Sequence, residues 1–144
     1  PWQHVLEPLS GYLSLGADLY QRDNSHGESY NFGPSSDQNF NVSTLIEEMA
    51  RHWENVKWNN TNVKQDVIYE AGLLKLNCDK ANARLKWSPT LDFKETVKFT
   101  IDWYKEYYQN DKNSMFDFSV KQIEQYISYA QERSIYWAGD KSRE

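Results

Sequence analysis

Apolar side chains recur three or four residues apart in four segments of the chain, which is the spacing of one helix face. These segments predict amphipathic helices over residues 7–20, 42–53, 92–109 and 119–134, and a shorter helix is expected over residues 79–85. The apolar stripes, taken in that order for the four long helices, are Leu6, Leu9, Leu13, Ala17 and Tyr20; Val42, Leu45, Ile46, Met49 and Trp53; Phe93, Val97, Ile101, Tyr104 and Tyr108; and Val120, Ile123, Ile127 and Ala130.

Capping residues mark where the helices begin. Pro8 suits a first helical turn, because its missing N–H has no partner to lose there. Residues 92 and 95 form an Asp-x-x-Glu capping pair, and residues 119 and 122 form a Ser-x-x-Gln pair. For the second helix, Asn41 and the pair Thr44–Glu47 are equally good caps. Both alternatives stay open from the sequence.

Short strands are predicted between the helices, over residues 29–34, 56–58 and 73–76. Strands this short do not form a large sheet of their own. We therefore expect an α/β chain that is mainly helical, with a few short strands that complete or lean on something larger.

The composition limits the classes of partner. The net charge is −5 with scattered Lys and Arg, so no basic stripe indicates nucleic acid or an anionic membrane surface. The single cysteine, Cys78, excludes an intrachain disulfide and favours a reducing, cytoplasmic location. Aromatic residues make up 15% of the chain while the mean hydropathy is −0.87, a combination typical of a small globular domain with a wet surface. No apolar run approaches the roughly 20 residues that span a bilayer.

The usual catalytic and metal-binding motifs are missing from the sequence. None of the 6 Gly residues falls in a phosphate-loop spacing. His4, His26 and His52 are far apart and lack ligand spacing, so no metal site is expected. Tyr108 and Lys112 have Tyr-x-x-x-Lys spacing, but about one such pair is expected by chance among this many Tyr and Lys residues. We therefore assign no catalytic residue in this chain.

Two polar and aromatic clusters are candidate binding sites. One is the run 1–7, with Gln3 and His4 entering a helix, although both side chains would equally suit backbone contacts at a helix start. The other is the run 66–72, where the Glu70 carboxylate would suit a ribose diol and the Tyr69 ring would suit a base or phosphate. A solvated charge and a core aromatic explain the second run as well.

The order in which several short residue runs follow one another along the chain is a further guide to function. Residues 1–9, 30–34, 69–77 and 79–81 are followed by the Leu-Lys-Trp-Ser-Pro turn at 85–89, Trp-Tyr at 103–104, and the tail 116–138 containing Gln-Ile-Glu-Gln-Tyr at 122–126. This series resembles the C-terminal part of CDP-glucose 4,6-dehydratases, within the extended short-chain dehydrogenase/reductases that remodel nucleotide sugars. The likeness covers essentially the entire chain.

The resemblance implies a division of labour. The chain would be the C-terminal sugar-nucleotide-binding portion, with residues 1–110 as substrate-binding helices and short strands and residues 111–144 as a helical tail. The parent enzyme would bind NAD in an N-terminal Rossmann domain absent from this chain, which starts at Pro1 without an initiator Met. It would convert CDP-glucose to CDP-4-keto-6-deoxyglucose in polysaccharide and lipopolysaccharide (O-antigen) biosynthesis, as a cytoplasmic homo-oligomer. Alone, the chain would lack activity and would bind no cofactor.

Carried over position by position, the resemblance makes Glu70 the first candidate for substrate contact, Tyr69 the second and Gln3 the third, with His4 beside it. We also expect exposed apolar surface where the Rossmann domain would dock. Two other functions remain open: the corresponding part of another nucleotide-sugar epimerase or dehydratase, and a stand-alone helical interaction module that uses its Trp and Tyr surface.

Overall fold

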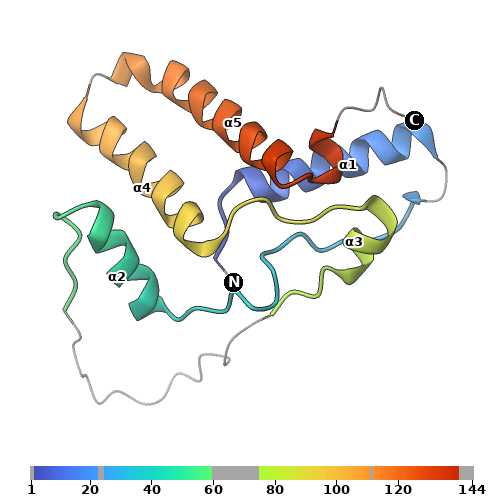
Figure 1. Ribbon diagram of the computed structural model, residues 1–144, viewed down its shortest axis with the longest axis horizontal. Helices are drawn as coiled ribbons and strands as arrows, with labels where there is room; N and C mark the ends of the chain where they lie inside the picture. The colour runs from blue at the N-terminus through green and yellow to red at the C-terminus, as the bar shows by residue number, and fades with distance from the viewer. Residues whose placement is uncertain (1, 23–24, 60–74, 111, 140–144) are drawn as a thin grey trace.

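A computed structural model describes residues 2–22, 25–59, 75–110 and 112–139 of the chain. Within these ranges the fold is helical and contains no strand (Figure 1). The elements, in chain order, are α1 (Leu6–Gln21), α2 (Val42–His52), α3 (Asp79–Leu85), α4 (Phe93–Gln109), the 3₁₀ turn η2 (Lys112–Ser114), α5 (Met115–Glu132) and the 3₁₀ turn η3 (Tyr136–Ala138). The mainly helical class expected from the sequence is confirmed, and no Rossmann core is present in the described part.

Helices α2 and α4 pack against each other through the apolar stripes that the sequence predicts. Phe93, Val97 and Ile101 of α4 are buried against Leu45 and Met49 of α2. The two helices begin as expected, with one alternative now decided. Asp92 and Glu95 form the reciprocal capping box on α4, and the side chain of Asn41 accepts the amide N–H of residue 44 to cap α2. The C-terminal part of the α4 stripe, at Tyr104 and Tyr108, is exposed to solvent instead.

A second core lies between α1, α3 and the chain that follows α3. Trp87 is 1% exposed, and its ring meets the edge of Phe32 with centroids 5.0 Å apart. Phe32 in turn lies close against α1 at Gly11, where an added Cβ would stand 2.4 Å from the ring. Gly11 is therefore the residue that lets the chain around Phe32 approach α1.

Helix α1 meets the C-terminal part of α5 (Figure 1), and both helices bury mainly polar residues where they meet. An apolar stripe ordinarily faces the core. Here Leu9 and Leu13 of α1 are 44% and 77% exposed, and Ile123 of α5 is 44% exposed. The buried residues are instead Glu7, Ser10 and Gly11 on α1 and Gln122 and Tyr126 on α5, where Ala130 is the one member of the predicted stripe that is buried.

The predicted start of α5 is wrong by four residues. The helix begins at Met115, and Ser119 with Gln122 does not form the expected capping box. Ser119 instead accepts the indole N–H of Trp103 at 3.1 Å, and the Gln122 side chain donates to the backbone oxygen of Phe99 at 2.8 Å. Both side chains hold α5 against α4, a tertiary use that a capping pattern does not reveal.

The predicted short strands are also corrected where the structure describes them. Residues 29–34 and 56–58 form no ladder, and residues 75–76 of the third predicted strand are irregular. Residues 73–74 lie outside the described ranges. An alternating segment becomes a strand only beside a second extended segment. Residues 76–78 lie beside residues 31–33, but Asn31 and Cys78 reach the facing backbone through their side chains and the two segments form no backbone ladder.

No helix in the described part of the chain is long and apolar enough to cross a membrane.

Candidate functional site

The buried faces of α1 and α5 meet at the carboxylate of Glu7, which is 1% exposed. It accepts the backbone N–H of Leu91 at 2.7 Å and that of Thr90 at 3.0 Å, and the hydroxyl of Tyr126 donates to it at 2.9 Å. Ser10, one turn along α1, accepts the indole N–H of Trp87 at 2.9 Å. This buried polar network ties α1, α5 and the turn before α4 together.

Burial and hydrogen bonding act on Glu7 in opposite directions. Loss of solvation raises the pKa of the Glu7 carboxyl, while the amides of residues 91 and 90, the Tyr126 hydroxyl and the charge of Arg133 lower it. The pKa of Tyr126 is raised by burial and by the nearby Glu7 carboxylate. Because each oxygen of Glu7 already accepts backbone or phenol donors, the group is suited to holding the fold rather than to moving protons.

Arg133 closes the same region from the end of α5. Its guanidinium donates to the carboxylate of Glu95 at 2.8 and 2.5 Å, and also to the backbone oxygen of Thr90. The pairing holds the pKa of Glu95 below its usual value. The turn that leads into α4 is thus held by Glu7 on one side and Arg133 on the other.

Gln3 and His4, two of the residues selected from the sequence, lie just before α1. Both line a hollow of about 390 Å³ between the start of the chain, α4 and α5. Its other walls come from residues of mixed polarity: Val5, Leu6, Thr100, Trp103, Tyr104, Ser119, Gln122 and Ile123. We call this space the Gln3–His4 hollow.

The two side chains differ in how their polar atoms are satisfied. Gln3 donates from its Nε2 to the backbone oxygen of Phe32 at 3.2 Å, but its Oε1 is buried with no hydrogen-bond partner in the described structure. The imidazole of His4 accepts the N–H of Leu6 through Nδ1 at 3.4 Å, and its ring meets Phe99 edge-on. Burial lowers the pKa of His4 to about 4, so its ring is neutral at pH 7.

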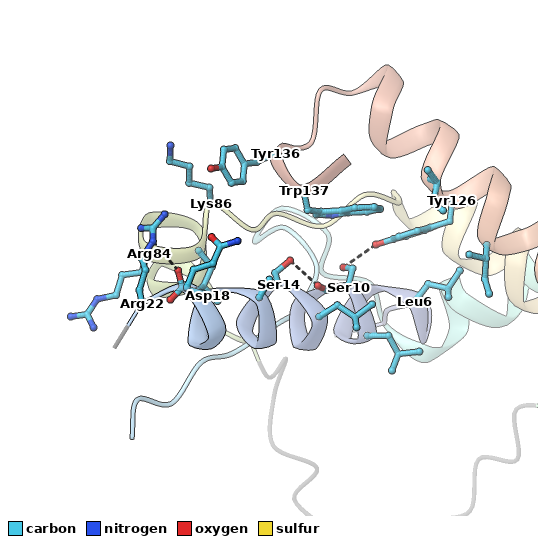
Figure 2. Close-up of a pocket in the computed structure, with 17 residues that line it drawn as sticks. Leu6, Ser10, Ser14, Asp18, Arg22, Arg84, Lys86, Tyr126, Tyr136 and Trp137 are labelled. Carbon is cyan, nitrogen blue, oxygen red and sulfur yellow. Dashed lines mark hydrogen bonds and ion pairs between the residues drawn. The ribbon is translucent and has the colours of Figure 1, made fainter. Parts of the chain in front are cut away.

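A larger groove of about 490 Å³ runs between α1, α5 and η3 (Figure 2). Its apolar lining comes from the exposed stripes of the two helices: Leu6, Leu9, Leu13 and Ala17 on α1, and Ile123 and Ile127 on α5. Asp18, Arg22, Arg84 and Lys86 gather at the end away from Leu6, as Figure 2 shows. We call this space the α1–α5 groove.

The structure tests the sequence-based site only in part. Glu70 and Tyr69 lie outside the described residues, so their roles stay predictions. Gln3 and His4 are placed together at one hollow. The buried network around Glu7 was not predicted, because Glu7 and Ser10 have the polar character of a solvated helix face. The position of Glu7 between Leu6 and Leu9 was the available signal.

Within the ranges that the structure describes, no three His, Cys, Asp or Glu side chains gather in a way that would hold a metal ion. Cys78 is a free, half-buried thiol, and burial raises its pKa. The features that remain are two cavities lined mainly by apolar and uncharged polar groups, with charged side chains at one end of the α1–α5 groove. Such an arrangement is suited to binding.

Comparison with known proteins adds the family context. No family model matches the sequence. The chain is 34% identical over 129 residues to the CDP-glucose 4,6-dehydratase of Salmonella typhimurium. The match covers 89% of this chain and 35% of that protein, so the chain spans about a third of the length of the curated relative it matches. The resemblance inferred from the residue runs is confirmed: over most of its length this chain is similar to part of a CDP-glucose 4,6-dehydratase.

Proposed function

We propose that this chain is the sugar-nucleotide-binding portion of an NAD-dependent CDP-glucose 4,6-dehydratase. The parent enzyme would convert CDP-glucose to CDP-4-keto-6-deoxyglucose with loss of water, in the cytoplasm, as a step in nucleotide-sugar and polysaccharide biosynthesis. The observation that carries the proposal is the 34% identity that extends along 89% of the chain to a protein of that name. The division into a binding part (residues 1–110) and a tail (residues 111–144) belongs to the same proposal.

The residues of the chain support a role in binding rather than in redox chemistry. The sequence has no glycine-rich loop to receive the pyrophosphate of NAD. The buried titratable groups are also engaged: Glu7 accepts two backbone amides and a phenol, and His4 is neutral in an apolar setting. The chain therefore does not fit NAD, and the proposal assigns that cofactor to a Rossmann domain elsewhere in the parent.

The Gln3–His4 hollow is the proposed contact with the sugar nucleotide inside the described part. A buried amide oxygen without a donor is costly, at about 1–3 kcal/mol. The Oε1 of Gln3 is such an atom in a residue that lines the hollow. Hydroxyl groups of a ribose or hexose are donors of suitable chemistry. Glu70 and Tyr69 are proposed to add a carboxylate and a phenol to the same ligand.

The direct test is a chimera in which this chain replaces the matching third of the Salmonella enzyme. Its kcat/KM should be measured on CDP-, UDP-, GDP- and dTDP-glucose. We expect turnover of CDP-glucose at least about tenfold above the other three, because a specific hydrogen-bonding contact is worth at least about 1.4 kcal/mol of discrimination.

The control is the same enzyme with its own segment restored. A folded chimera that prefers another nucleotide sugar would assign the chain to a different epimerase or dehydratase. A folded chimera that retains NAD but turns over no nucleotide sugar, while the restored enzyme is active, would contradict a substrate-binding role.

Substitutions at the proposed contacts should change substrate affinity more than chemistry. In the active chimera, Glu70→Ala and Gln3→Ala are each expected to raise the KM for CDP-glucose about five- to tenfold, with less than a twofold change in kcat, since both remove uniform binding. Glu124→Ala, on the exposed face of α5, is the matched control and should change neither constant. An unchanged KM in Glu70→Ala would remove that residue from the site.

A further inference from the structure

The apolar stripes of α1 and α5 face outward, because buried hydrogen bonds hold the opposite faces of both helices inside the fold. The Glu7 carboxylate links α1 to residues 90 and 91 and to Tyr126 of α5, while Ser10 accepts from Trp87 and lies 3.1 Å from the Tyr126 hydroxyl. Turning α1 to bury its leucines would break this network and would place the Glu7 carboxylate in water. The leucines therefore stay on the surface unless something covers them.

The exposed apolar surface is long and continuous. Leu6 and Ile123 line both the α1–α5 groove and the Gln3–His4 hollow, so the two spaces are adjacent. Along α1 the lining runs from Leu6 to Gln21, about 22 Å at 1.5 Å per residue. A groove of this length with apolar walls marks an interaction surface rather than scattered surface leucines.

We propose that the α1–α5 groove is the docking surface for the part of the parent enzyme that this chain does not include. The inference rests on the proposed function and adds which face makes the interface. The Salmonella relative is almost three times as long as the region it shares with this chain, so a partner of sufficient size belongs to the same polypeptide. Residues 3–6 line the adjacent hollow, so the groove and the proposed ligand contact lie next to each other.

The charged side chains at the end of the groove away from Leu6 indicate what chemistry the partner has there. Arg22, Arg84 and Lys86 outnumber the one carboxylate there, Asp18. Asp18 pairs with Arg22 at 3.6 Å, Arg84 pairs with Glu28 at 3.6 Å, and Lys86 lies over the ring of Tyr136. We infer that the docked element is apolar along most of its length and carries an acidic group near Lys86.

A second copy of the chain fits this surface less well. A two-fold dimer brings the same patch of both subunits together. Two facing grooves would leave the space between them unfilled, whereas a protruding helix or sheet face would fill it.

Hydroxyl-radical footprinting tests the proposal without altering the protein. Leu13 and Ile123 should be oxidised at least about tenfold more slowly in the chimera than in the free chain, studied where ultracentrifugation shows a monomer. Val42 at the start of α2 is 50% exposed, away from the groove, and should react equally in both forms. Equal oxidation of Leu13 in the free chain and in the chimera would overturn the proposal.

Substitution supplies the second measurement. Leu13→Asp should leave the melting temperature of the free chain within about 1 °C, because Leu13 is 77% exposed there, and should lower that of the chimera by about 5 °C or more. Val42→Glu should change neither. If Leu13→Asp abolishes self-association of the free chain and leaves the chimera unchanged, the groove is an interface between copies and the proposal fails.

These readouts are independent of substrate. Protection of Leu13 in a chimera that rejects CDP-glucose would support the docking surface while removing the proposed function. Turnover of CDP-glucose without protection of Leu13 would support the proposed function and would remove the docking surface.

Discussion

Replacing Glu7 by alanine is expected to lower the free energy of unfolding of this chain by about 3–5 kcal/mol, the range for removing one partner of a buried charged network. The carboxylate is 1% exposed and takes donors from the backbone of residues 90 and 91 and from Tyr126. In the alanine variant these donors stay buried without an acceptor. Because small domains are stable by only about 5–15 kcal/mol, a loss of this size is a large share of the total.

Glutamine at the same position separates hydrogen bonding from charge. In Glu7→Gln, one amide oxygen can accept both backbone N–H groups. The amide nitrogen can donate to the Tyr126 hydroxyl, which then turns its own proton to Ser10, 3.1 Å away. We therefore expect Glu7→Gln to lose only about 1–2 kcal/mol, consistent with one altered buried hydrogen bond.

Urea unfolding followed by circular dichroism measures both variants, with Glu124→Ala on the exposed face of α5 as the matched control. The control should stay within about 0.5 kcal/mol of the wild type. If Glu7→Ala is as stable as the control, the buried network does not hold α1, α5 and the turn before α4 together.

Trp87→Ala is the second substitution with a large expected effect, a loss of about 3–5 kcal/mol of unfolding free energy. Trp87 is 1% exposed, packs edge-on against Phe32 and donates its indole N–H to Ser10. Alanine would leave a cavity under α1 and α3 and would remove a donor from the polar network. Trp87→Phe keeps most of the ring and should lose about 1–2 kcal/mol less than alanine.

Trp58 provides the comparison, because it is 43% exposed. Trp58→Ala should change the unfolding free energy by no more than about 0.5 kcal/mol. Circular dichroism is the suitable signal, since each variant removes a fluorescent indole. Equal losses for the substitutions at positions 87 and 58 would show that the core between α1 and α3 is not formed as described.

The sequence was sufficient to locate the helices, because periodicity and capping are local. Residues 79–85 were predicted to the residue, and the Asp92–Glu95 capping box was correct. The start of α5 was misplaced because Ser119 bonds to Trp103, on another helix. Trp103 lies 16 residues before Ser119 in the sequence, whereas a capping pattern relates only residues of the same helical turn. The strand over residues 29–34 also depended on a distant segment: residues 76–78 lie beside it but form no backbone ladder with it.

The direction that the apolar stripes face was beyond the reach of periodicity. A stripe such as Leu6, Leu9 and Leu13 shows where the apolar side of a helix lies, not which neighbour covers it. The buried side of α1 is fixed by bonds from Glu7 to residues 83 to 119 positions away. The expectation that a chain of this kind exposes apolar surface follows from its resemblance to part of a longer enzyme. Only the structure identifies the surface as that of α1 and α5.

Of the two candidate runs selected from the sequence, one falls, apart from residue 1, within the described residues. The run 1–7 was selected for its polar and aromatic side chains, and the structure places Gln3 and His4 together at one hollow. The neutral state of His4 and the unpartnered oxygen of Gln3 depend on burial by α4 and α5, which the run itself does not contain. The role of the run 66–72 in substrate contact, through Glu70 and Tyr69, stays a prediction.

Photoaffinity labelling of the chimera is the most direct measurement of the central claim that this chain contacts the sugar nucleotide. A photoreactive CDP-glucose analogue is cross-linked to the chimera and the labelled peptides are identified by mass spectrometry, with unlabelled CDP-glucose as competitor. We predict competed cross-links within residues 2–144 of this chain, including the peptide that carries Gln3 and His4, while a photoreactive NAD analogue labels only the remainder of the enzyme. Competed CDP-glucose labels found solely outside this chain would contradict the account.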